Sequence, residues 1–96
     1  MRLSWSPRAR GDIDGIHDWV REHSAPGATR VIAEVRKTAD LIARHPGIGR
    51  PTNRLRIRVL PVVRFPYLIY FTVHSDEVVI LHVRHGARAE PNPNEF

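Results

Sequence analysis

The apolar residues of this chain follow one spacing in its first half and another in its second half. Before residue 45 they recur every three or four positions, the period of a helix with one buried face. After residue 56 they alternate with basic residues or form short β-rich runs, which is typical of strands. This change of period predicts an α+β domain in which helices cover one face of a sheet.

Two helices are predicted in the first half, after a short strand at Arg2–Trp5. Ser6 and Pro7 indicate an N-cap followed by proline at the first helical position. The segment 23–27 breaks the first helix, and Ser24 or Pro26 begins the second. So short a break predicts an antiparallel helical hairpin. The expected buried stripes are Ala9, Ile13, Ile16 and Val20 in the first helix, and Ile32, Val35, Ala39 and Ile42 in the second.

The second half is predicted to form the rest of a mainly antiparallel sheet, in the order β-α-α-β-β-β. Residues 46–51, PGIGRP, are a turn-rich crossing into it. Ile57 and Val59 alternate with Arg56 and Arg58, which indicates a strand with one apolar and one basic face. Residues 65–73 and 78–84 are further strands joined by a turn at 74–77. We expect one domain over residues 1–88 and a flexible C-terminal tail over residues 89–96.

Composition indicates where such a protein works. No cysteine occurs, so neither disulfides nor thiolate metal sites are available. The N-terminal residues lack the apolar core of a signal peptide, and no apolar run is long enough for a membrane span. We therefore expect a cytoplasmic protein with no membrane contact.

The basic residues favour binding over proton transfer. Between residues 54 and 88 six arginines face only two acids, Asp76 and Glu77, and Lys37 is the only lysine of the chain. Such a field attracts nucleic acid or acidic protein surfaces. Arginine grips carboxylate and phosphate but is a poor general base.

Other chemistry is poorly supported. His82 and His85 are an odd number apart, so a regular strand points them to opposite faces, and His17 and His23 are badly spaced on a helix. The serines lie beside caps and turns, and GIGRP lacks the lysine and the helix of a phosphate loop. We expect no metal, no cofactor and no nucleophilic triad.

The arginine-bearing strand is the main candidate for a functional surface. Arg54, Arg56 and Arg58 share a strand parity that continues to Arg64. The surface either binds an anionic partner or only keeps an exposed strand soluble and unaggregated. His85 and Arg88, after the last strand, are expected to lie beside it, with His85 a hydrogen-bonded surface histidine or a weak catalytic candidate.

Four segments, taken in order, resemble the ParE branch of the RelE/ParE superfamily of type II toxins. They are SPRARGDIDGIHDWV, HPGIGRP, FPYLIYFTV and VVILHVRHGAR, and the similarity extends from Leu3 to Arg88. The resemblance implies a helical hairpin against a small antiparallel sheet. It also implies a ParD-like antitoxin that wraps the toxin and alone contacts operator DNA.

The resemblance implies two alternative targets. ParE toxins poison DNA gyrase, whereas RelE toxins cut mRNA in the ribosome without a metal. The nuclease pattern of lysines with a late tyrosine is missing, because no lysine follows Lys37 and no tyrosine follows Tyr70. We therefore expect a gyrase inhibitor rather than an mRNA endonuclease, with a non-toxic basic binding module as a third reading. The expected contacts with target or antitoxin are Arg56, Arg58, Arg64, Arg84, His85, Arg88, Trp19 and Val20.

Overall fold

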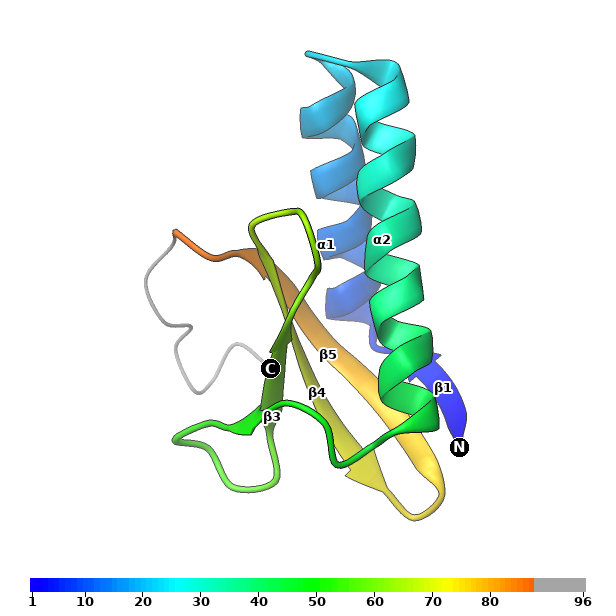
Figure 1. The fold of residues 1–96 in the computed structure, drawn as a ribbon, viewed down its shortest axis with the longest axis vertical. Coiled ribbons are helices and arrows are strands. Elements are labelled where there is room, and N and C mark those ends of the chain that lie inside the picture. The colour runs from blue at the N-terminus through cyan, green and yellow to red at the C-terminus, as the bar shows by residue number, and fades with distance from the viewer. Residues whose placement is uncertain (88–96) are drawn as a thin grey trace.

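The computed structural model describes residues 1–87 as two helices packed on one face of a five-stranded sheet (Figure 1). The α+β class and the helical hairpin predicted from the sequence are confirmed. Arg88 and the predicted tail, residues 89–96, lie outside the described residues. The elements are β1 (Arg2–Trp5), α1 (Pro7–Arg21), α2 (Ala25–Arg44), β2 (Arg50–Pro51), β3 (Arg58–Pro61), β4 (Tyr67–His74) and β5 (Glu77–His85).

Both helices begin where the sequence predicts them. The Ser6 hydroxyl accepts a hydrogen bond from the Ala9 N–H at 3.1 Å, and the Ser24 hydroxyl accepts one from the Gly27 N–H at 2.9 Å. Each serine satisfies a backbone donor that the first turn of a helix leaves unpaired. Neither helix of the described chain is long and apolar enough to cross a membrane.

The strand order is β1-β5-β4-β3-β2, so the first and last strands lie side by side. β1 runs parallel to β5, from Arg2 opposite Glu77 to Trp5 opposite Ile80, and the other pairs are antiparallel. In β5, Ile80 pairs with Phe71 and His82 pairs with Tyr70, so Leu81 is an extra residue that forms a bulge. The short strand β2 falls within the segment that the sequence predicts only as a crossing.

The main core lies between the helices and the sheet. From α2 the predicted residues Val35, Ala39 and Ile42 are fully buried, and they belong to the same cluster as Ile69 and Phe71 of β4. In α1 only Ala9 is fully buried, while the rest of its predicted stripe packs against the edge of the cluster. One face of α1 therefore stays open toward the end of β5.

The prediction of one continuous basic strand around Arg56 is wrong. β2 ends at Pro51 and β3 begins at Arg58, so Arg54 and Arg56 lie in a loop, and Arg64 lies in the next loop after β3. Arg56 and Arg64 have φ angles of 68° and 75°, which no strand residue adopts. The loop is held instead by hydroxyl bonds, from Thr52 to the Ile57 carbonyl and from Thr72 to the Arg56 carbonyl, each 2.8 Å.

Candidate functional site: a cleft between the first helix and the last strand

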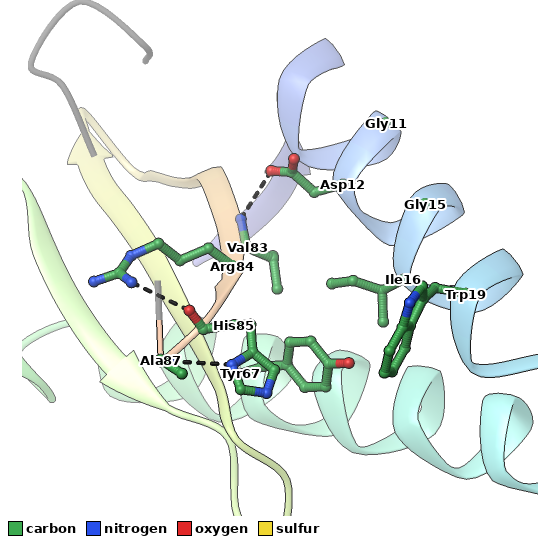
Figure 2. Close-up of a pocket in the computed structure, with 10 residues that line it drawn as sticks. All are labelled: Gly11, Asp12, Gly15, Ile16, Trp19, Tyr67, Val83, Arg84, His85 and Ala87. Atoms are coloured by element: carbon green, nitrogen blue, oxygen red, sulfur yellow. Dashed lines mark hydrogen bonds between the residues drawn. The ribbon is translucent and has the colours of Figure 1, made fainter. Parts of the chain in front are cut away.

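A cleft of about 550 Å³ separates α1 from the second half of β5 (Figure 2). It exists because the chain leaves the sheet after Trp5 and turns into α1, while β5 continues for five residues beyond Ile80. The cleft is lined on the helix side by Gly11, Asp12, Gly15, Ile16 and Trp19, and on the sheet side by Tyr67, Val83, Arg84, His85 and Ala87.

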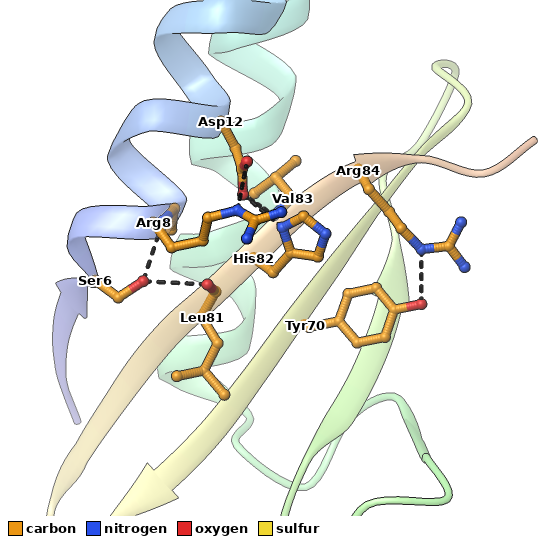
Figure 3. Close-up of polar contacts among 9 residues, drawn as sticks. Ser6, Arg8, Asp12, Tyr70, Leu81, His82, Val83 and Arg84 are labelled. Carbon is orange, nitrogen blue, oxygen red and sulfur yellow. Dashed lines mark hydrogen bonds and ion pairs between the residues drawn. The ribbon is translucent and has the colours of Figure 1, made fainter. Parts of the chain in front are cut away.

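The turn from β1 into α1 is fastened to β5 through Ser6. The Ser6 N–H donates to the Ile80 carbonyl at 2.9 Å, and its hydroxyl donates to the Leu81 carbonyl at 3.1 Å (Figure 3). Because that hydroxyl also accepts the N-cap bond of α1, one side chain fixes both the start of the helix and its distance from the strand.

Asp12 ties the middle of α1 to the same strand (Figure 3). Its Oδ2 accepts from His82 Nδ1 at 2.6 Å and from the Val83 N–H at 3.0 Å, and its Oδ1 accepts from Arg8 Nε at 3.2 Å. Burial raises the pKa of Asp12, but the hydrogen bonds with His82 and Val83 outweigh it, so the pKa lies below its ordinary value. An ionised carboxylate only accepts, so His82 carries its proton on Nδ1.

Arg84 lies on the other face of the sheet and is almost completely buried, with 5% of it exposed. Its Nε donates to the Tyr70 hydroxyl at 3.0 Å, and its Nη1 donates to the His85 carbonyl at 3.1 Å. The guanidinium also lies over the Tyr70 ring, 5.5 Å from the centroid. Arg84, which the sequence predicts as a contact with target or antitoxin, thus has its guanidinium buried and bonded within the fold.

His85 lies at the mouth of the cleft and is half-buried. Its ring stands edge-on to Tyr67 with 5.5 Å between the centroids, and its Nδ1 accepts from the Ala87 N–H at 3.0 Å. His82 packs with Tyr70 on the other face of the sheet, so the predicted opposition of the two histidines is confirmed.

Two glycines leave part of the helix side of the cleft without side chains. A Cβ at Gly11 or Gly15 would meet nothing within 4 Å, and Trp19, one turn further on, is 61% exposed. Of the two predicted contacts on this helix, Trp19 therefore lines the cleft. Val20 packs against the core instead, near Gly27 of α2.

The remaining predicted arginines lie away from the cleft. The guanidinium of Arg58 donates to the carbonyls of Gly49 at 2.8 Å, Gly47 at 3.2 Å and Ile48 at 3.4 Å. It therefore holds the crossing from α2 into the sheet in place. Arg56 is exposed on its loop beside Leu55, which is 86% exposed, and Arg64 is exposed on the next loop.

Sequence reasoning missed Asp12, Tyr70 and His82 as site residues. No local pattern connects Asp12 with His82, because 70 positions separate them in the sequence. Within residues 1–87, no three histidine, aspartate or glutamate side chains come close enough together to hold a metal ion.

Comparison with known proteins places this geometry among bacterial toxins. Residues 3–90 match the family model described as the ParE toxin of the type II toxin–antitoxin system parDE. The toxin RelE2 of Caulobacter vibrioides is 34% identical over 91% of this chain and 97% of its own length. The toxin ParE1 of the same organism is 28% identical over 88% and 91%.

A solved structure has a similar fold. The chromosomal ParDE system from P. aeruginosa contains a chain with a TM-score of 0.80 and 26% identity, covering 88% of this chain and 95% of that one.

Proposed function

Because the chain belongs to the ParE toxin family of type II toxin–antitoxin systems, we propose that it inhibits DNA gyrase and that a ParD-like antitoxin neutralises it. In this proposal the toxin acts in the cytoplasm and reaches operator DNA only through the antitoxin. The family match over residues 3–90 and the likeness to a chain of a ParDE system support the antitoxin as partner.

The state of His85 supports gyrase over mRNA as the target. Because Nδ1 accepts the Ala87 N–H, a neutral His85 has its proton on Nε2 and offers no basic nitrogen to a substrate hydroxyl. The guanidinium groups of Arg58 and Arg84 also donate hydrogen bonds within the fold, to backbone carbonyls and to the Tyr70 hydroxyl. A nuclease of this family would have to recruit its proton acceptor elsewhere.

One observation favours the mRNA endonuclease as the second candidate. RelE2, 34% identical to this chain, carries the name of the RelE branch. Gyrase inhibition and mRNA cleavage should produce different cell states, so an experiment can distinguish the two targets directly.

The experiment expresses the chain from an inducible promoter without its antitoxin. We expect filamentous cells, an induced DNA-damage reporter and intact mRNA, together with inhibition of gyrase supercoiling by the purified toxin. His85→Ala should weaken toxicity only modestly. Discrete mRNA cuts in translating ribosomes, lost in His85→Ala while gyrase works normally, would replace gyrase by mRNA. Normal growth with full-length soluble protein would instead favour the non-toxic binding module.

A further inference from the structure

The loop between β2 and β3, residues 52–57, projects from the edge of the sheet, away from both helices (Figure 1). Hydrogen bonds within the loop close it. The Thr52 N–H donates to the Ile57 carbonyl at 3.0 Å, and the Ile57 N–H donates to the Arg54 carbonyl at 3.2 Å. The Thr52 hydroxyl also accepts from the Arg54 N–H at 3.1 Å. The tip of the loop is therefore held in a defined conformation before any partner binds.

The tip presents an apolar side chain between two arginines. Leu55 is 86% exposed, and Arg54 and Arg56 on either side of it are also exposed. Arg56 has a φ angle of 68°, which costs free energy in residues other than glycine and which asparagine adopts more readily than arginine. Within residues 1–87 the guanidinium of Arg56 forms no hydrogen bond or ion pair. The packing of the described chain therefore does not require an arginine at this position.

The charge around the tip has one sign. Four arginines lie between residues 50 and 58, namely Arg50, Arg54, Arg56 and Arg58, and no acid occurs from residue 41 to residue 75. Three of them, Arg54, Arg56 and Arg58, line a hollow of about 320 Å³ beside the loop. Such a field attracts a polyanion, and the planar guanidinium group binds phosphate well.

The narrow form of the tip favours duplex DNA over other anionic partners. The minor groove of DNA is about 6 Å wide and admits single side chains. Proteins that bind there combine arginines with an apolar side chain that enters between two base pairs. The minor groove of duplex RNA is wide and shallow and would not enclose one side chain. A stable complex with an acidic protein needs a broader apolar area, whereas Leu55 is the one exposed large apolar residue of residues 52–57.

We propose that this loop binds duplex DNA, with Leu55 inserted into the minor groove and Arg54 and Arg56 on the phosphates beside it. Phosphates carry no direct sequence information, so the loop contacts DNA of any sequence and leaves operator recognition to the antitoxin. The proposal goes beyond the inhibition of gyrase and holds whether or not gyrase is the target. In a complex with gyrase, which acts on duplex DNA, the loop would give the toxin a second contact.

Fluorescence anisotropy of the free full-length toxin with a labelled duplex of about 20 base pairs tests the phosphate contacts. Arg56→Asn removes the charge and suits the positive φ angle. The matched control is Arg64→Asn, because Arg64 is exposed on another loop with a φ angle of 75°. We expect Arg56→Asn to weaken binding about five- to tenfold and to lower the slope of log affinity against log salt by about one. The control should change the affinity less than about twofold. Equal losses in both variants would attribute binding to net charge alone and overturn the proposal.

A fluorescent base analogue tests the insertion of Leu55. Aminopurine placed at a flexible TA step gains fluorescence when the base is unstacked. The wild type should raise this fluorescence, whereas Leu55→Ala should keep the salt slope and lose most of the rise. Binding without a rise, or an equal rise with Leu55→Ala, would refute the inserted leucine. Tighter binding to single-stranded RNA of the same length would assign the loop to RNA instead. If the toxin inhibits gyrase but binds no duplex at about 50 mM salt, this proposal fails and the proposed function stands.

Discussion

Replacing Asp12 by alanine should be among the most damaging single substitutions outside the apolar core. The carboxylate accepts hydrogen bonds from His82 Nδ1 and the Val83 N–H, which belong to residues only 4% and 2% exposed. Each buried donor left without an acceptor costs about 1–3 kcal/mol. Since the cleft admits some water to the site, we expect a total loss of about 3 kcal/mol. For a domain of this size that lowers Tm by roughly 12–24 °C.

The same carboxylate should make stability depend on acid. The pKa of Asp12 is lower in the folded chain than in the unfolded chain, so its contribution is complete above the unfolded pKa. It is lost as pH falls below about 4 and through the folded pKa. Asp12→Asn keeps an oxygen for the Val83 N–H but has no charge to titrate. It should be less destabilising than alanine and should flatten the acid limb.

Urea unfolding followed by circular dichroism between pH 7 and pH 2.5 measures both effects. The control is Asp14→Ala on the same helix, which removes an exposed carboxylate and should change stability by less than about 0.5 kcal/mol. An Asp12→Ala variant as stable as that control would show that the carboxylate is not needed to hold α1 on β5. Parallel acid limbs for the wild type and Asp12→Asn would refute the assigned pKa.

Three further substitutions test other parts of the structure. Arg58→Ala should lower the free energy of unfolding by about 1–3 kcal/mol because three carbonyls lose their donor, whereas Arg64→Ala should be neutral in the same urea titration. Gly15→Leu should fill the cleft and weaken antitoxin binding at least tenfold by calorimetry without lowering Tm; unchanged affinity would place the antitoxin elsewhere. In a Trp5→Phe background, antitoxin binding should shift Trp19 fluorescence to shorter wavelength, and an unchanged spectrum would remove this ring from the interface.

The features predicted correctly from the sequence are those set by neighbouring residues. Ser6 and Ser24 cap helices through bonds to residues three positions away, so a short stretch of sequence contains the whole signal. The burial of Val35, Ala39 and Ile42 likewise follows from helical spacing on one face. Such a pattern can be recognised in the sequence without knowing what the buried face packs against.

The predictions that failed depend on contacts between distant segments. Arg56 alternates correctly with Ile57, but the hydroxyl of Thr72, 16 positions away, holds its carbonyl in a loop. Arg84 belongs to the basic residues between 54 and 88 and was predicted to contact a target or antitoxin, yet Tyr70 in the neighbouring strand provides a buried partner. The bond between Asp12 and His82 requires β1 to place α1 along β5, which sequence spacing alone does not reveal.

The position of β5 between β1 and β4 has a consequence for how the protein is made. Within residues 1–87, β5 is the last strand in the sequence, and it pairs with the first strand on one side and with β4 on the other, where the pairing is the longest of the sheet. A nascent chain that extends only to the turn at 74–77 therefore has both helices but lacks the strand that joins β1 to the rest of the sheet. The cleft between α1 and β5 cannot exist on such a nascent chain. Translation must therefore pass His85 before the sheet and the cleft beside it can form.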